Sequence, residues 1–364
     1  DWGIDRQMKV TNEYYRELME ANGSLDFYTD ILGIISVFGI IGISVISTKW
    51  SDASVGSYSW IFMTVAQSTL KFAFPAVIMI SGIKYLSPTE APTLKRLYSY
   101  DILRLAVILV FWSGLYIFIE KLLIKDKYSF GIKQYLADLT TGQNHLWLIY
   151  GLIGLLIVSP LLKKIVSDKK ILEYFLIIWI VFTVIGNIIV SIPDPYINLE
   201  KRIKTFEMSA AIHFSGYFCL GYYLDKHEIK KPLRILTYFL SALSIVAFAA
   251  VTYRFSVKDG KLVGIFLQNT LPMTVLIPSA FFLFAKNVFK KQTSPRSIAF
   301  IAKASFGAYL CHAVVLKAIE RASLLPNDIH MIYQIIITTV VTYLISLIVS
   351  AILNCIPFVK KYIV

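Results

Sequence analysis

Ten separate apolar segments dominate this sequence and restrict its fold more than any other feature. Each has at least 18 residues, and an α-helix of that length crosses most of a hydrocarbon layer about 30 Å thick. A segment surrounded by lipid must satisfy its own backbone hydrogen bonds, as a helix does. The sequence therefore predicts an all-α polytopic membrane protein with about ten transmembrane helices. The predicted segments are Ile31–Thr48, Trp60–Leu86, Leu103–Ile124, His145–Leu162, Ile171–Ile192, Phe206–Leu224, Leu233–Tyr253, Gly264–Phe289, Ile298–Ile319 and Met331–Ile356.

The composition agrees with a membrane protein. Of the 364 residues, 57% are hydrophobic and only 16% are charged, which is too little polar surface for a soluble domain of this size. Residues 1–30 are polar and are predicted to form a juxtamembrane segment, whereas residues 31–364 form the transmembrane domain. The three cysteines (Cys219, Cys311 and Cys355) have no metal or redox spacing, so no metal site is predicted.

The basic residues predict the orientation of the chain. Lys and Arg are more frequent in alternate connections, and the positive-inside rule then places both termini in the cytoplasm. The protein is accordingly expected to be a multi-pass protein of the cell inner (plasma) membrane. Its net charge of +13 indicates contact with anionic lipid headgroups and no nucleic-acid partner. The sequence leaves a homo-oligomer open.

Three stretches carry a resemblance to a known family, with Arg104 and Phe111-Trp112-Ser113 between two of them. They are Phe74–Gly82, Asn144–Leu155 with the following Ser159–Leu162, and Ala304–His312. In this order they resemble the bacterial integral-membrane acyltransferase family 3. The resemblance covers nearly the whole chain from Leu25 onward, and its most distinctive part is His145-Leu146-Trp147.

The resemblance implies a membrane O-acyltransferase. Members of the family typically have ten helices and move an acyl group, usually acetyl, from cytoplasmic acyl-CoA to a hydroxyl of a surface glycan. For this chain it implies acetyl-CoA as donor, a glycan or lipid-linked acceptor, and a role in exopolysaccharide O-acetylation.

The first helix departs from the family pattern. The family carries an Arg there and a His eleven positions later, on one helix face and about 16 Å apart. Those positions here are Gly33 and Ser44. Glycine has no cation, and the serine hydroxyl accepts no proton near neutral pH. Either another residue is the base, or the chain is a non-catalytic relative that acts as a transporter, flippase-like or partner membrane protein.

Three residues are candidates for the chemistry. His145 either positions the acceptor and handles a proton or caps the start of a helix at the membrane interface. His312 lies within a predicted helix, where a polar side chain usually faces the bundle interior. Ser44 is conceivable as a covalent acyl carrier, but it would need a nearby base.

Other polar residues are candidates for substrate contact. Ser305 and Tyr309 share a helix face with His312, and this stripe either lines a tunnel or forms a satisfied hydrogen-bond network. Asn144 precedes His145 in the family block. Trp147 is either a ligand contact or an interface anchor. Lys71 lies in an apolar segment and is expected to face a wet interior.

Lys95, Arg96 and Arg104 are candidates for binding the phosphates of acyl-CoA. A guanidinium pairs well with phosphate oxygens, and Arg104 lies within the region of family resemblance. The alternative is the ordinary positive charge of a cytoplasmic connection.

Overall fold

Helices are the only regular secondary structure in the part of this protein that the structure describes. The structure is a computed structural model, and it describes residues 26–88, 91–123, 144–181, 210–262, 273–289, 293–322 and 329–364. No strand occurs in these ranges. Within them, seven helical spans are long and apolar enough to cross a membrane, and two of these spans, Tyr58–Leu86 and Leu94–Ile119, each combine consecutive helical elements. The candidate spans are Phe27–Lys49, Tyr58–Leu86, Leu94–Ile119, Trp147–Val166, Lys231–Asp259, Arg296–Arg321 and Met331–Cys355.

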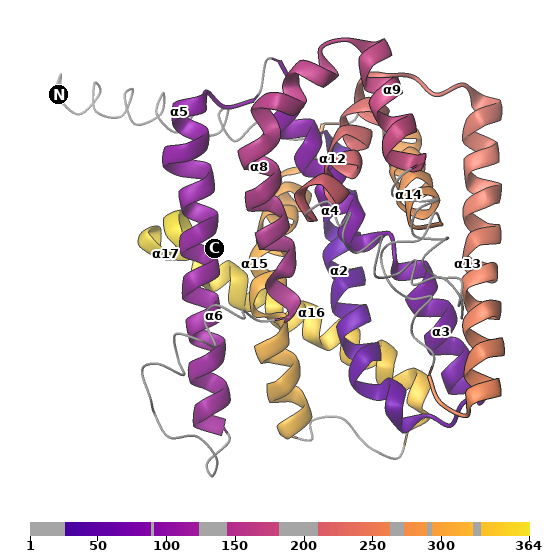
Figure 1. Cartoon of the computed structure of the whole chain (residues 1–364). Helices are drawn as coiled ribbons and strands as arrows, with labels where there is room; N and C mark the ends of the chain where they lie inside the picture. The colour runs from indigo at the N-terminus through magenta and orange to yellow at the C-terminus, as the bar shows by residue number, and fades with distance from the viewer. Residues whose placement is uncertain are drawn as a thin grey trace, which may run out of the picture.

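The helices form a single bundle around α2 (Figure 1). Helix α2 (Phe27–Lys49) packs against α4 (Ala73–Leu86), α14 (Met273–Phe289), α15 (Arg296–Arg321) and α16 (Met331–Cys355). The remaining long helices are α3 (Tyr58–Leu70), α6 (Leu103–Leu123), α8 (Trp147–Val166), α9 (Lys169–Ile180), α12 (Ala210–Lys226) and α13 (Lys231–Asp259). Shorter elements are η1 (Trp50–Asp52), α5 (Leu94–Arg96), η2 (Leu97–Ile102), η3 (Asn144–Leu146) and α17 (Pro357–Tyr362).

Each predicted apolar segment coincides with at least part of a described helix. The segments at Ile298–Ile319 and Met331–Ile356 end within two residues of α15 and α16. The predicted segments at 171–192, 206–224 and 264–289 lie partly outside the described residues. Most of the predicted juxtamembrane segment lies outside them as well, and α2 begins at Phe27.

The predicted segment Trp60–Leu86 is two helices. Helix α3 ends at Leu70 and α4 begins at Ala73. Pro75 explains the break, because its ring clashes with the carbonyl of residue i−4, which is Lys71, and it offers no backbone N–H. Lys71 therefore lies at the break, with a side chain that is only 6% exposed.

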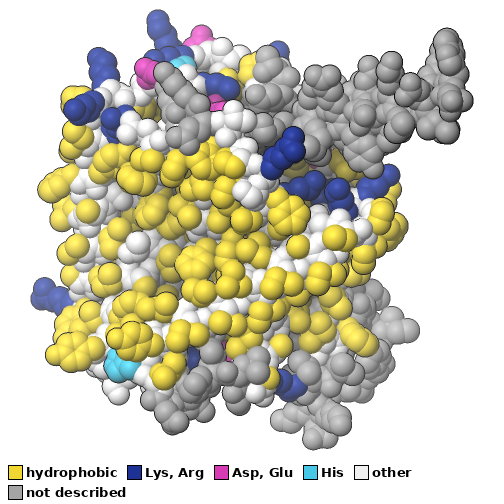
Figure 2. Space-filling view, turned by 180° about the vertical axis from the view of Figure 1, so that it is seen from behind, with side chains coloured by type: hydrophobic (Ala, Val, Ile, Leu, Met, Phe, Trp, Pro, Cys, Tyr) yellow, Lys and Arg dark blue, Asp and Glu magenta, His cyan; other side chains and the backbone are white. Residues whose placement is uncertain are grey.

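The outer surface of the bundle is apolar along much of its length. Side chains such as Leu161 (71% exposed), Phe239 (64%) and Val110 (62%) point away from the protein. Figure 2 shows a broad band of such side chains, with most Lys and Arg side chains of that face above it. A soluble protein rarely exposes a continuous apolar surface of this size, so the band is the surface expected to contact lipid.

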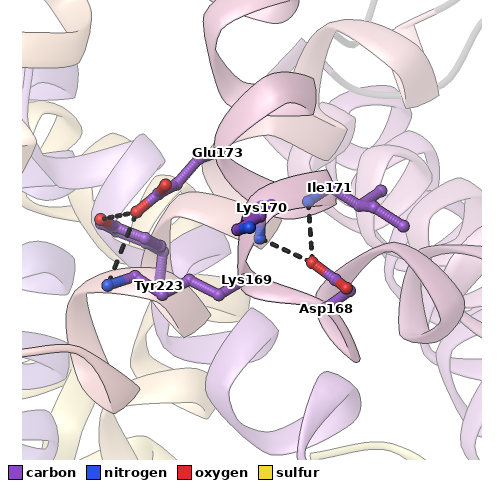
Figure 3. A network of polar contacts seen from close by, with 6 residues as sticks. All are labelled: Asp168, Lys169, Lys170, Ile171, Glu173 and Tyr223. Atoms are coloured by element: carbon purple, nitrogen blue, oxygen red, sulfur yellow. Dashed lines mark hydrogen bonds and ion pairs between the residues drawn. The ribbon is translucent and has the colours of Figure 1, made fainter.

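Several helix connections gather at one end of the bundle, which is the top in Figure 1. The turn between α8 and α9 is one of them. Asp168 caps α9 there, because its Oδ1 accepts hydrogen bonds from the amides of Lys170 (2.7 Å) and Ile171 (3.1 Å). The Tyr223 hydroxyl of α12 donates to Glu173 at 2.8 Å, and the Lys169 ammonium lies 3.7 Å from the same carboxylate (Figure 3).

Replacing Asp168 with alanine should lower stability modestly. The substitution removes the acceptor for two amides at the start of α9, and loss of such a cap typically costs about 0.5–2 kcal/mol. We expect a lower unfolding temperature in detergent for Asp168→Ala and little change for Asp168→Asn. Equal unfolding temperatures for the Ala variant and the native protein would show that the cap contributes nothing.

Glycines bring α4 and α12 into backbone contact. A Cβ added at Gly82 would lie 1.9 Å from the carbonyl oxygen of Phe218, and one at Gly221 would lie 2.1 Å from that of Met79. The contact is thus reciprocal, with a glycine of each helix against the backbone of the other. Small residues permit such close crossings of membrane helices, where apolar side chains gain little by leaving lipid.

Candidate active site

Four elements bring polar and aromatic side chains together inside the bundle. Ser44 comes from α2, Tyr116 from α6, His145 from η3, and Tyr309 and His312 from α15. Tyr116, Tyr309 and His312 are each at most 1% exposed, and the other two are partly exposed. We call these five residues the His145–His312 cluster.

His312 is the centre of the cluster. Its Nδ1 lies 2.6 Å from the backbone carbonyl oxygen of Tyr309, and its Nε2 lies 3.1 Å from the hydroxyl oxygen of Ser44. A carbonyl oxygen only accepts, so Nδ1 carries the proton in this hydrogen bond. In the neutral ring, Nε2 is then a proton acceptor that faces Ser44.

His145 lies next to His312. The two imidazole rings are 5.5 Å apart between centroids, and the ring of Tyr116 is 4.3 Å from that of His145. The Tyr309 hydroxyl donates a 2.5 Å hydrogen bond to the backbone carbonyl of His145, which ties η3 to α15. His145 Nε2 is buried and has no hydrogen-bond partner among the described residues. This nitrogen therefore has free hydrogen-bonding capacity inside the bundle.

Tyr116 belongs to the cluster although the sequence analysis did not select it. Its hydroxyl donates to the carbonyl of Leu310 at 2.8 Å, so it fixes α6 against α15. The available signal was its position four residues after Trp112, which places both residues on one helix face. Their rings are 6.2 Å apart.

Comparison with protein families identifies the chain. The family model described as an acyltransferase domain, Acyl_transf_3, matches residues 27–353. The chain belongs to this acyltransferase family. Searches of curated proteins and of solved structures gave no significant match. The match includes all five residues of the His145–His312 cluster, so the acyltransferase domain contains the whole candidate site.

Other predicted residues of this acyltransferase lie outside the cluster. Ser305 donates to the Ile301 carbonyl at 2.8 Å and lies 3.2 Å from the Tyr343 hydroxyl of α16. The Trp147 ring packs between Phe74 of α4 (centroids 4.7 Å apart) and Phe214 of α12 (5.4 Å apart). Ser305 therefore has hydrogen-bond partners within the protein, and the Trp147 ring has aromatic ones.

The positions of two further predicted residues are also given by the structure. Lys71 is buried at the break between α3 and α4. Asn144 begins η3 next to His145, but its side chain lies outside the described part of the chain.

Arg104 contacts α17 and the residues that follow it. One of its guanidinium nitrogens (Nη2) donates to the backbone carbonyl of Val364 and lies 3.5 Å from that of Lys360. Its Nε is buried without a partner in the described part of the chain. Arginine has five N–H donors, so this guanidinium retains donors for an anion.

Arg96 belongs to the same group of basic side chains as Arg104, whereas Lys95 does not. Arg96, Arg104 and Lys84 all lie within electrostatic reach of the Asp101 carboxylate, and Lys303 and Lys360 are near Arg104. The Lys95 side chain is exposed, and no described contact joins it to this group. We call Lys84, Arg96, Arg104, Lys303 and Lys360 the basic cluster.

Among the residues that the structure describes, no group of three or more His, Cys, Asp or Glu side chains could hold a metal ion.

Proposed function

We propose that this chain is a membrane O-acyltransferase that transfers an acyl group, acetyl in the simplest case, from acyl-CoA to a hydroxyl. The acceptor is a cell-surface glycan or a lipid-linked precursor of one, and the membrane is the cell inner membrane. The observation that carries the proposal is the pair of imidazoles within a matched acyltransferase domain, 5.5 Å apart and inside a helix bundle.

The chemistry needs a base for the attacking hydroxyl. An imidazole is suited to this because its ordinary pKa lies near neutral pH, and a positioned general base contributes typically about 10²–10⁴-fold. His312 supports this role, because its Nδ1 hydrogen bond leaves Nε2 as a proton acceptor. His145 has an unpartnered Nε2 and is the better candidate for binding the acceptor hydroxyl.

The donor would bind at the basic cluster. Arg104 and Tyr116 both lie on α6, and twelve helical positions separate them by about 18 Å. The phosphates of acyl-CoA would then bind near Arg104 at one end of α6. The pantetheine arm of acyl-CoA would extend along the helix, so that the thioester reaches the His145–His312 cluster. Guanidinium groups favour phosphate because their planar N–H fork matches its oxygens.

Arg104→Ala should weaken acetyl-CoA binding, measured by calorimetry on the purified protein in detergent. The loss of a charge-assisted phosphate contact should raise the dissociation constant by about tenfold or more, since hydrogen bonds to charged groups contribute about 1.5–3 kcal/mol. Lys95→Ala is the matched control, because its exposed side chain lies outside the basic cluster. Equal affinities for both variants would remove Arg104 from the donor site.

The alternative is a non-catalytic member that acts as a transporter, flippase-like or partner protein. Gly33 favours it, since α2 has no cation at the position to which the family resemblance assigns an arginine. A Cβ at Gly33 would meet only Ile80, at 3.9 Å, so a side chain can be introduced. If neither the native chain nor the Gly33→Arg, Ser44→His double variant binds acetyl-CoA or releases CoA thiol from it, the acyltransferase proposal is wrong.

A further inference from the structure

We propose that Ser44 is a nucleophile that carries the acyl group as a covalent ester between donor and acceptor, with His312 as its base. This inference rests on the proposed function and adds to it the identity of an intermediate. It starts from the 3.1 Å approach of the Ser44 hydroxyl oxygen to His312 Nε2. A serine becomes nucleophilic when an adjacent base within hydrogen-bond reach takes its proton.

The base is oriented by a third group, as such a pair requires. His312 Nδ1 donates to the Tyr309 carbonyl oxygen at 2.6 Å, which holds the ring and directs its unprotonated Nε2 toward Ser44. His312 is fully buried, so water does not compete for this nitrogen. The arrangement is a nucleophile, a base and a backbone group that positions the base.

The Ser44 hydroxyl has two acceptors for its single proton. His312 Nε2 and the carbonyl oxygen of Ile40 each lie 3.1 Å from Ser44 Oγ. In a purely structural serine the helix carbonyl takes the proton, as it does for Ser47 and Ile43 at 2.8 Å one turn further along α2. At Ser44 the hydroxyl can turn instead to the imidazole, which leaves an oxygen lone pair for attack.

The position of Ser44 along α2 explains why a covalent intermediate would help the transfer. Ser44 lies seventeen positions after the start of α2, about 26 Å along the helix axis. Direct transfer needs acyl-CoA and the acceptor in the site together. An acyl-serine lets CoA leave on the donor side before the acceptor hydroxyl arrives from the other.

Both half-reactions balance without another reagent. In the first, the Ser44 proton moves to His312 Nε2, the oxygen forms a C–O bond to the acyl carbon, and the C–S bond breaks. His312 then protonates the CoA thiolate. In the second, the acceptor hydroxyl gives its proton to His312 and attacks the ester carbonyl. The bond to Ser44 breaks, and the serine oxygen recovers the proton.

The test is covalent trapping without an acceptor. The purified full chain in detergent is mixed with radiolabelled acetyl-CoA. A parallel reaction uses radiolabelled octanoyl-CoA. In both reactions, the CoA thiol that is released is measured with a thiol reagent. We expect a burst of about one CoA per chain and label that survives denaturation. Mass spectrometry of the labelled peptide should place the acyl group on Ser44.

Variants distinguish a nucleophile from a structural serine. Ser44→Ala should lose both burst and label, whereas the matched Ser47→Ala, whose hydroxyl also bonds a helix carbonyl, should keep both. Ser44→Cys should carry the label as a thioester, which neutral hydroxylamine removes. Such a shift in chemical lability cannot arise from packing.

The outcomes separate this inference from the proposed function. Label on another residue, or CoA release by Ser44→Ala at the native rate, would overturn the role of Ser44 and leave an acyltransferase that works by direct transfer. Absence of acyl-CoA binding and of CoA release in the native chain would overturn both.

Discussion

His312→Gln should lower the rate of CoA release from acetyl-CoA by about 10²–10⁴-fold, the range that a positioned general base contributes. The imidazole is the only group in the described structure seen within hydrogen-bond distance of Ser44 Oγ apart from the Ile40 carbonyl of its own helix. Glutamine preserves polar character but accepts no proton near neutral pH. His312 lies nine positions after Lys303, the basic-cluster residue on α15, which is about 14 Å along the helix. The affinity for acetyl-CoA should therefore change little.

This choice of substitution avoids a misfolded variant. Alanine would leave a cavity at a fully buried position, and large-to-small changes of this kind commonly cost several kcal/mol. Tyr343→Phe is a suitable control, since it removes a buried hydroxyl of α16 that lies 3.2 Å from Ser305 on α15, the helix that also carries His312. A His312→Gln protein that binds acetyl-CoA and releases CoA at the native rate would exclude His312 as the base.

Gly82→Ala and Gly221→Ala should each strongly destabilise the bundle. Alanine usually stabilises a helix relative to glycine by about 0.5–1 kcal/mol. Here the added Cβ atoms would lie 1.9 and 2.1 Å from backbone carbonyl oxygens, which cannot move without separating α4 from α12. Overpacking typically costs about 1–3 kcal/mol, and backbone obstruction should place these variants at or above the upper end.

The loss of stability is measured as the thermal unfolding temperature in detergent, which is monitored by size-exclusion chromatography of heated samples. Gly33→Ala is the matched control on α2, because its Cβ would meet only Ile80 at an ordinary 3.9 Å. We expect Gly33→Ala to unfold at or above the native temperature and the other two well below it. Similar unfolding temperatures for all three variants would contradict the close crossing of α4 and α12.

The arrangement of helices along the chain was accessible from the sequence, because membrane helices need long apolar segments and their ends carry polar residues. The ends of two predicted segments agree with α15 and α16 to within two residues. The division of Trp60–Leu86 at Lys71 was missed, although Pro75 contained the signal. The family was predicted from the motifs and is confirmed by the match to residues 27–353.

The sequence by itself determined that the chain is helical, that it is a membrane protein and that it belongs to an acyltransferase family. It also placed His312 and Tyr309 on one face of one helix, because helical periodicity is local. Only the tertiary structure brought Ser44 to His312, which is 268 positions away, and Tyr116 to His145. Periodicity shows which face of a helix is polar, but which faces meet depends on tertiary packing, of which the close glycine crossing of α4 and α12 is an example.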